Sequence, residues 1–345
     1  MDAIDTVVAH AIQYFDLSTP VQVVAHLPSH YHQSVHLRAA NGDFVLKVYM
    51  VDQDDAALFY EQRLVRWLSW RPTSFAVPLP LRRRWSLDYS ARVGSYCYSL
   101  SQFIVGETLN FQGHADDKHR LQFTEGYAMG TALSELQTML QARPAQHRRP
   151  SALFQSLLTY MQPRYDPLRL AAAHVGVTSD DKVLWEWWRG EASELMKFMS
   201  DHYTALPHQI CHNDYEPSNL LLRDGRVAAI LDFEFACPAA RALDVAMALR
   251  MIMHLQSNPI NPWGIAEQFC HGYAEWITLT PQEIAAMPHL IRLSTAIPMI
   301  WAMSKPNLIN SESLVQAIQR MQQIKTWMSC HHTQLIALLQ TTFAT

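Results

Sequence analysis

Residues 210–234 read ICHNDYEPSNLLLRDGRVAAILDFE, in which Asp224-Gly225 separates two short apolar runs. An Asp-Gly pair between such runs predicts a β-hairpin with a two-residue turn. Counting outward from this turn places Asn219 opposite Ile230. Side chains alternate between the two faces of a strand, so we expect Asn219 and Asp232 to emerge on one face at the open end of the hairpin.

The oxygen-bearing side chains at this end of the hairpin predict a site for phosphoryl transfer. Diagonal neighbours across a hairpin lie roughly 7–8 Å apart, close enough for Asn219 and Asp232 to share one Mg²⁺, which takes few protein ligands besides phosphate oxygens. Asp214 lies on the loop that enters the hairpin, five residues before Asn219, so we expect it beside Asn219 and Asp232, where it offers a carboxylate for the hydroxyl of an acceptor. In-line phosphoryl transfer requires such a set, so we predict Asp214 as the catalytic residue and Asn219 and Asp232 as metal ligands.

A lysine and a glutamate in the first hundred residues form a second candidate pair. Lys47 lies in an apolar run that follows the turn signal Asn41-Gly42, and Glu61 falls within the apolar stripe of a helix predicted over residues 54–70. A buried carboxylate is costly unless it is paired, so we expect an ion pair between Lys47 and Glu61. A partly exposed Glu61 is the alternative.

The pattern His-x-Asp-x4-Asn over residues 212–219, followed by Asp-Phe-Glu at 232–234, resembles the catalytic-loop and metal-binding motifs of kinases. In these variants it is similar to the superfamily of aminoglycoside phosphotransferases, choline kinases and type II homoserine kinases. The resemblance implies an α+β, bilobal protein-kinase-like fold. The small β-rich N-lobe is expected over residues 1–105, and the larger, mainly helical C-lobe over residues 106–345.

The same resemblance implies ATP and Mg²⁺ as cofactors and assigns residues to the nucleotide. The family's hinge, where backbone groups meet adenine, corresponds to residues 98–106, and the loop that covers the phosphates corresponds to residues 29–34. This loop contains no glycine here, although such loops usually do. The nucleotide contacts implied by the resemblance are Lys47 held by Glu61, Ser29, Ser34, Gln102 and Ile104.

Three further features concern the catalytic loop and the acceptor. Asp244 resembles the acid that follows the metal loop in such enzymes, and we expect it to brace the catalytic loop by hydrogen bonds. Glu216 and Glu234 flank the predicted centre and offer negative charge to an ammonium group, although Arg241 could equally neutralise one of them. Residues 272–290 are similar to type II homoserine kinases.

The predicted function is ATP-dependent transfer of a phosphate to the hydroxyl of a small molecule, such as an amino acid, an amino alcohol or an aminoglycoside. A protein Ser/Thr kinase on the same scaffold is an alternative. A non-catalytic, nucleotide-binding pseudokinase module is another, favoured by the glycine-free loop. Among aromatic and histidine clusters, Trp185, Trp187 and Trp188 favour core packing over a pocket wall, and His30, His32 and His36 favour loop positions over a metal site.

Composition restricts the class of protein and of partner. The 345-residue chain has a formal net charge of −4, which makes nucleic acid a poor default partner. Its five cysteines form no C-x-x-C pair, which argues against a zinc knuckle or a disulfide scaffold. The acidic N-terminus and the lack of a run of roughly 18 apolar residues predict a soluble, cytoplasmic protein without a membrane partner. The sequence leaves the oligomeric state open.

Overall fold

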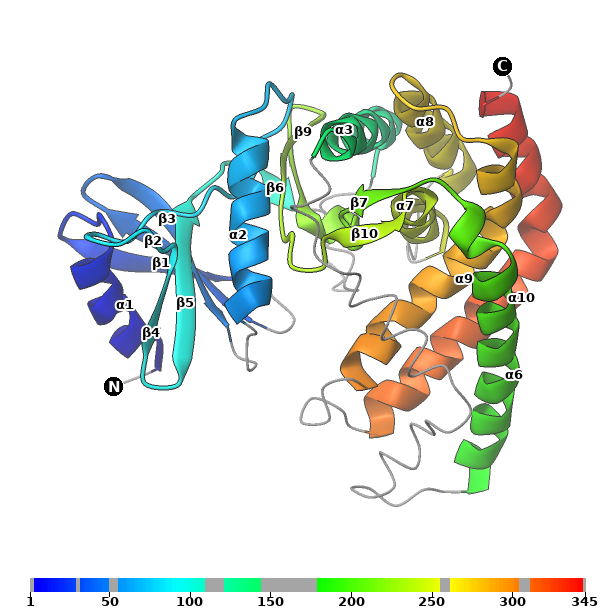
Figure 1. Ribbon diagram of the computed structural model, residues 1–345, viewed down its shortest axis with the longest axis horizontal. Helices are drawn as coiled ribbons and strands as arrows, with labels where there is room; N and C mark the ends of the chain where they lie inside the picture. Colours follow the sequence, from blue (N-terminus) through cyan, green and yellow to red (C-terminus); the bar gives the residue numbers. More distant parts are fainter. Residues whose placement is uncertain are drawn as a thin grey trace. The chain divides into compact units, whose positions relative to one another are not determined.

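The computed structural model describes residues 3–28, 32–49, 55–108, 121–143, 179–254, 261–303 and 311–343 (Figure 1). The chain divides into two compact units. The first comprises Met1–Thr108 with Leu220–Glu234, and the second comprises Leu109–Asn219 with Phe235–Thr345. The hairpin of residues 220–230 therefore belongs to the first unit, although its sequence lies far from the rest of that unit.

The first unit contains a five-stranded antiparallel sheet with the strand order β1-β2-β3-β5-β4. The hairpin predicted at Asn41-Gly42 forms, with Ala39 paired to Gly42 and Gly42 in a positive-φ conformation (φ +140°) at the start of its strand. The strands are β1 (Val21–Leu27), β2 (Gln33–Ala39), β3 (Gly42–Tyr49), β4 (Ser90–Val93) and β5 (Tyr96–Gln102).

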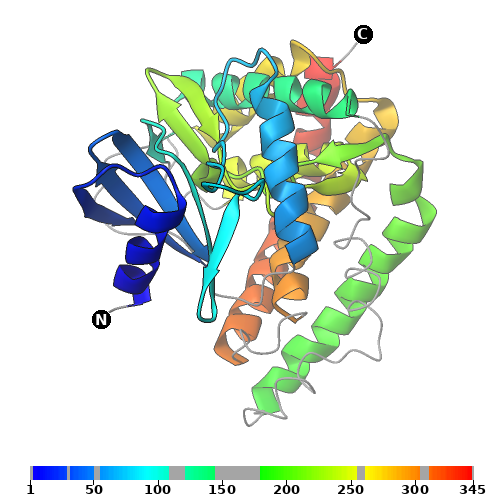
Figure 2. The same cartoon turned by 60° about the vertical axis from the view of Figure 1, so that its left-hand side comes forward.

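Two helices, α1 (Ala3–Tyr14) and α2 (Asp55–Ser69), cover opposite faces of this sheet (Figures 1 and 2). The buried residues of α1, among them Val7 and Ala11, pack in one cluster with Leu46 and Leu100 of the sheet. On β3, the side chain of Tyr49 points to the opposite face of the sheet from that of Leu46, and it packs with Leu58 of α2. Lys47 has the parity of Tyr49, so it extends from the face of the sheet that α2 covers.

The hairpin of the first unit consists of β8 (Leu220–Arg223) and β9 (Arg226–Ile230), and β6 (Glu107–Thr108) pairs with β8. The predicted turn is confirmed, because Asp224 and Gly225 both have positive φ. The predicted pairing of Asn219 with Ile230 is wrong by one residue, because Leu220 takes that place. The extra residue is Ala228, whose carbonyl accepts a hydrogen bond from the Ala76 N–H (2.8 Å).

The second unit is mainly helical, with one antiparallel strand pair. Arg292 of α9 and Lys325 of α10 both bind Glu194 of α6, so charged contacts join these three helices. The elements are α3 (Phe123–Gln141), α6 (Ser179–Asp201), β7 (His208–Cys211), β10 (Cys237–Ala240), α7 (Ala242–His254), α8 (Pro262–Ala274), α9 (Pro281–Met303) and α10 (Ser311–Phe343), with short 3-10 turns at Tyr203–Ala205 and Pro217–Asn219.

Helices α3 and α8 cross at a contact that only glycine allows. A Cβ atom on Gly130 of α3 would lie 1.9 Å from the carbonyl oxygen of Phe269, and one on Gly272 of α8 would lie 2.1 Å from that of Tyr127. Elsewhere in this unit, Trp185 and Trp188 are buried in α6, which confirms the core-packing interpretation for both. No helix within the described ranges is long and apolar enough to cross a membrane.

Candidate active site

Asp214 and Asn219 meet directly in the second unit, on the segment between β7 and β8. The amide nitrogen of Asn219 donates to the Asp214 carboxylate oxygen Oδ2 (2.7 Å) and to the Asp214 carbonyl (2.9 Å). Because the amide group is planar, its other end, Oδ1, points away from Asp214. An amide oxygen in that position is the kind of ligand that Mg²⁺ prefers. The sequence prediction that these two side chains lie close together is therefore confirmed.

Asp244 holds the loop that carries Asp214. Its buried carboxylate, in the first turn of α7, accepts the backbone N–H groups of His212 (3.0 Å) and Asn213 (2.7 Å). Burial raises the pKa of Asp244, while His212 and these hydrogen bonds oppose the rise. The expectation that Asp244 braces the catalytic loop is confirmed.

Gln137 of α3 is a residue that supports this loop and that the sequence reasoning missed. Its amide nitrogen donates to the Asp244 carboxylate (3.2 Å) and to the carbonyl of Arg241 (2.9 Å). Its amide oxygen accepts from the Tyr273 hydroxyl (2.7 Å). The available signal was a polar residue within the apolar stripe of α3, four residues after the buried Leu133.

In the first unit, Lys47 faces the segment that follows β9. Its ammonium nitrogen lies 3.1 Å from Asp232 Oδ1 and 3.8 Å from Glu234 Oε2. Burial alone would lower the pKa of Lys47, but the charges of Asp232, Glu61 and Glu234 outweigh it and raise this pKa well above its usual value. The lysine is therefore a permanent cation beside the metal ligand that we predicted.

The predicted ion pair between Lys47 and Glu61 is not formed. Within the part of the chain that the structure describes, no hydrogen bond or ion pair of 4.0 Å or less joins them, and Glu61 Oε2 is buried without a hydrogen-bond partner. Burial raises the pKa of Glu61 to about 7, against the opposing charge of Lys47. The physical reason is competition, because the carboxylates of Asp232 and Glu234 hold the ammonium group instead.

His32 is a loop residue whose contact with Glu234 the sequence reasoning missed. It lies just before β2, it is 9% exposed, and its Nε2 atom lies 2.8 Å from Glu234 Oε2. Its ring also meets Tyr49 edge-on, with 5.0 Å between the ring centroids. His36 is buried as well, but it lies within β2 and stacks on Phe103. The expected loop position is therefore wrong for His36 and right for His32, which precedes β2.

The remaining predicted nucleotide contacts lie in the first unit. Ser34 pairs directly with Lys47 across β2 and β3, so both side chains lie on one face of the sheet. Gln102 ends β5, and Ile104 follows two residues later. Ser29, like His30, lies outside the described residues. The structure thus gathers Lys47, Glu61, Asp232 and Ser34 in one unit and Asp214 and Asn219 in the other.

The donor set fits a divalent cation. Three carboxylates, those of Glu61, Asp232 and Glu234, influence the one ammonium group of Lys47, so negative charge is in excess. Asp232 is one-third exposed and therefore within reach of an ion. Among the residues described, no group of three or more His, Cys, Asp or Glu side chains is arranged around a metal position.

Glu216 and Glu234, the acids considered as partners of Arg241 from the sequence, have other cationic partners. Arg241 binds Glu283 through two hydrogen bonds of 2.8 Å, so it neutralises neither Glu216 nor Glu234. Glu216 instead binds Arg250 of α7 (2.5 Å). The alternative in which Arg241 neutralises one of the flanking acids is therefore wrong.

A family model described as "Phosphotransferase enzyme family" matches residues 24–277. A homoserine kinase of Phenylobacterium zucineum is 27% identical over 294 residues, which are 84% of this chain and 81% of that protein. A homoserine kinase of Beijerinckia indica subsp. indica is 35% identical over 101 residues, but that match spans only 31% of that protein and 29% of this chain.

Solved structures share the fold. The amicoumacin kinase hAmiN, in complex with AMP-PNP, Ca²⁺ and Ami, has a TM-score of 0.67 at 14% identity, covering 94% of each chain. A microcompartment-associated aminopropanol kinase has a TM-score of 0.67 at 17% identity, covering 96% of this chain and 98% of its own. These likenesses, with the sheet-rich first unit and the helical second unit, confirm the predicted protein-kinase-like fold.

Proposed function

Because the chain belongs to the phosphotransferase enzyme family, we propose that it transfers the γ-phosphate of ATP to a hydroxyl group of a small molecule. The observation that carries this proposal is the Asp214–Asn219 hydrogen bond of 2.7 Å on a loop fixed by Asp244. It orients one carboxylate for an acceptor and leaves one amide oxygen for a cation. A module that only binds nucleotide has no need of an oriented Asp214.

In this proposal each role in phosphoryl transfer falls to a residue of this chain. Asp214 accepts or orients the proton of the acceptor hydroxyl, and Asn219 and Asp232 hold Mg²⁺, which when bound neutralises charge on the phosphates. Lys47 binds the α- and β-phosphates. In this proposal residues 1–105 form the nucleotide lobe, with adenine at Gln102 and Ile104 and Ser34 near the phosphates, and residues 106–345 supply the acceptor site.

The acceptor that we propose is a small amino acid such as homoserine. Glu216 lies two residues after Asp214 in the chain, and Arg250 of α7 binds it (2.5 Å) with a side chain that is only 8% exposed. Arg250 Nε is buried without a partner among the described residues. A cation and a carboxylate together match the two charges of an amino acid, whereas an amino alcohol lacks the carboxylate that Arg250 would bind.

The test of the activity is Mg²⁺-dependent release of ADP from ATP, measured with amino acids, amino alcohols, sugars, aminoglycosides and Ser/Thr peptides as acceptors. We expect release with a small-molecule acceptor, and Asp214→Asn should lower kcat by about 100-fold or more. Asp224→Asn, the same change in the exposed hairpin turn, is the matched control and should be neutral. Full activity of Asp214→Asn would refute the assignment, and release with peptides alone would support a protein kinase.

The test of the acceptor class compares homoserine with 3-amino-1-propanol, which is homoserine without its carboxylate. We expect the wild type to prefer homoserine in kcat/KM. Arg250→Met should reduce that preference about tenfold or more, because a charge-assisted hydrogen bond is lost for one acceptor only. An unchanged preference would remove Arg250 from the acceptor site without affecting the assignment of Asp214.

A further inference from the structure

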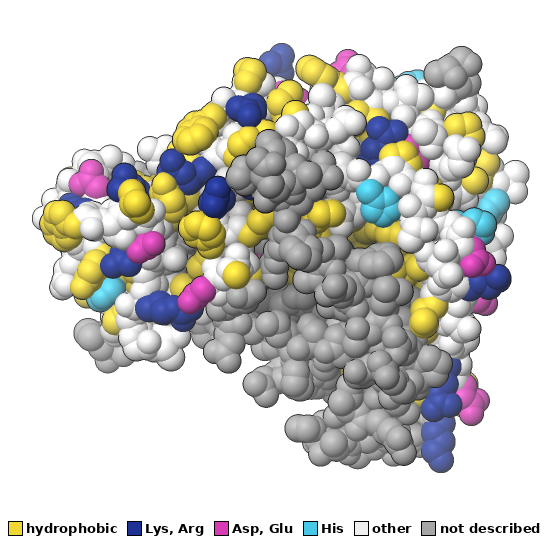
Figure 3. Space-filling model, in the orientation of Figure 1, with side chains coloured by type: hydrophobic (Ala, Val, Ile, Leu, Met, Phe, Trp, Pro, Cys, Tyr) yellow, Lys and Arg dark blue, Asp and Glu magenta, His cyan; other side chains and the backbone are white. Residues whose placement is uncertain are grey.

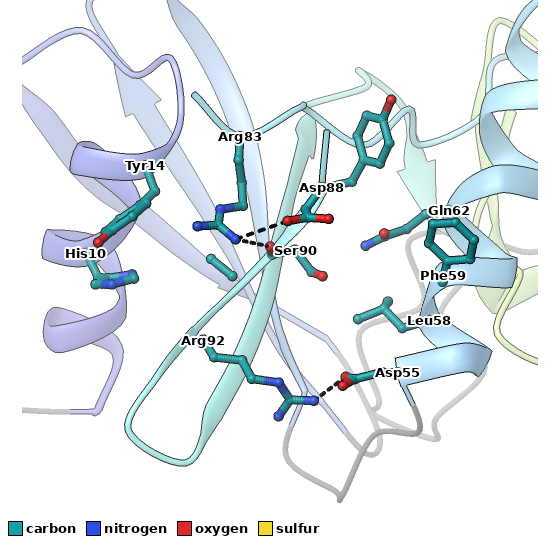
Figure 4. Close-up of a pocket in the computed structure, with 12 residues that line it drawn as sticks. His10, Tyr14, Asp55, Leu58, Phe59, Gln62, Arg83, Asp88, Ser90 and Arg92 are labelled. Atoms are coloured by element: carbon teal, nitrogen blue, oxygen red, sulfur yellow. Dashed lines mark hydrogen bonds and ion pairs between the residues drawn. The ribbon is translucent and has the colours of Figure 1, made fainter. Parts of the chain in front are cut away.

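A cavity of about 470 Å³ lies within the first unit, between α1, β4 and the start of α2 (Figure 4). This volume is within the range of small-molecule sites. Its wall combines apolar and aromatic side chains with two arginines, and those that matter here are Tyr14, Leu58, Phe59, Gln62, Arg83 and Arg92. The residues proposed for ATP, metal and acceptor do not line it.

Gln62 is a buried polar side chain directed into this cavity (Figure 4). It is 5% exposed, and its Nε2 atom has no hydrogen-bond partner among the residues that the structure describes. Buried polar groups are nearly always hydrogen-bonded, because an unmet donor loses its water without compensation. A buried donor that faces a cavity therefore indicates a missing acceptor inside that cavity.

Arg83 supplies a second unmet donor on the same wall. Its Nε atom is buried without a partner in the described part of the chain. Among the described residues, its Nη1 atom makes two long contacts, each of 3.5 Å, with Asp88 Oδ2 and the carbonyl of Ser90. Figure 4 shows this guanidinium group on the side of the cavity opposite α2, across from Gln62. The two donors thus face one space from two sides.

The chemistry of the wall selects the ligand class. Both unmet groups donate, so the ligand must bring acceptor oxygens, and a guanidinium group binds a carboxylate better than a neutral oxygen. Leu58, Phe59 and Tyr14 offer apolar surface for a short hydrocarbon part. Asp55 and Asp88, with side chains 79% and 64% exposed, lie at the rim, where they disfavour a doubly charged anion such as phosphate.

We propose that this cavity binds a small organic monocarboxylate, with its oxygens on Gln62 Nε2 and Arg83 and its apolar part against α2. In the space-filling view, Lys or Arg side chains lie among hydrophobic and acidic ones on the surface shown (Figure 3). Helix α2 also carries Glu61, so one helix connects this cavity with the charge cluster of Lys47. Both plain carboxylates and amino acids contain the proposed group, and the experiment distinguishes them.

The experiment measures ligand-dependent thermal stability of the full-length protein without nucleotide or metal. Propionate, isobutyrate and hydrocinnamate are compared with L-alanine, L-valine and L-phenylalanine, which carry a similar apolar part and an added amino group, and with the amides of the plain acids. We expect at least one carboxylate series to raise the melting temperature with concentration, and the amides to have no effect. Inorganic phosphate is included and should be weaker than the carboxylates.

Two variants assign the binding to this cavity. Arg83→Met and Gln62→Leu should each raise Kd about tenfold or more, because each removes a donor to the carboxylate. Gln62→Leu should also raise the melting temperature of the free protein, because it removes an unmet buried donor. Arg71→Met, which removes a positive charge at the end of α2, should bind as the wild type does.

The proposal is overturned if no carboxylate up to tens of millimolar stabilises the wild type. It is also overturned if the variants keep the full effect, since the ligand would then bind elsewhere, including at the acceptor site. Stronger binding of phosphate than of every carboxylate would overturn the ligand class. None of these outcomes bears on the assignment of Asp214, because the measurement does not depend on turnover.

Discussion

Glu61→Gln should make the protein more stable, and the gain should depend on pH. Glu61 is held beside Lys47, Asp232 and Glu234 without a hydrogen bond to its buried Oε2 atom. Burial raises its pKa from 4.5 to about 7. Glutamine keeps the size of the side chain but cannot ionise, so this substitution isolates the cost of the charge.

The size of the effect follows from the shift of this pKa. One pKa unit corresponds to about 1.4 kcal/mol, so ionised Glu61 costs up to about 3 kcal/mol of folding free energy. The folded state binds the proton more tightly than the unfolded state does. The contribution of this proton to the stability of the folded state is therefore complete below pH 4.5, and it is lost as the pH rises through about 7.

The assay is urea unfolding of wild type and Glu61→Gln between pH 4.5 and 8, without nucleotide or metal. At the acid end both proteins carry a neutral side chain, so their unfolding free energies should agree closely. At pH 8 the variant should be more stable by about 2–3 kcal/mol. A difference that does not change with pH, or a wild type that is more stable at pH 8, would refute the reasoning.

Two further substitutions test the packing that positions the site. Asp244→Ala should lower the free energy of unfolding by about 2–4 kcal/mol, because two buried backbone N–H groups lose their acceptor. It should also lower kcat in the ADP-release assay, because the catalytic loop loosens. Equal stability of wild type and variant in urea unfolding would contradict this prediction. Gly130→Ala should cost about 3 kcal/mol or more, because its Cβ would lie 1.9 Å from the Phe269 carbonyl. Gly190→Ala, with no atom within 4 Å of its Cβ on helix α6, is the matched control and should gain about 0.5–1 kcal/mol.

Features set by neighbouring residues could be predicted from the sequence. The Asp224-Gly225 turn forms because both residues tolerate positive φ, and the Asp214–Asn219 contact forms because only a short loop and one 3-10 turn separate them. Both features depend on local geometry, which the sequence encodes directly. The role of Asp244 followed instead from its resemblance to a family position, because its hydrogen bonds to His212 and Asn213 join residues 32 and 31 positions apart.

Features set by distant residues could not be predicted. The register of β8 and β9 shifts because Ala228 bonds to Ala76, which lies some 150 positions earlier in the chain. His32 can be buried because its Nε2 atom lies within hydrogen-bond distance (2.8 Å) of Glu234, which is 202 residues away in the chain. No periodicity or turn signal reports such contacts, so counting residues from the hairpin turn gives a register that is wrong by one.

The missing Lys47–Glu61 ion pair and the fit of the site to a divalent cation have the same cause. The sequence suggested one lysine and one glutamate, which would be balanced, but the fold adds Asp232 and Glu234 to the same cluster. One ammonium group cannot neutralise three carboxylates; it lies nearest Asp232, and the pKa of Glu61 is raised, so Glu61 takes up a proton more readily than a free glutamate does. Repulsion from Asp232 contributes to the raised pKa of Glu61. A cation bound at Asp232 would remove that repulsion, so Mg²⁺ should narrow the stability gap between wild type and Glu61→Gln at pH 8.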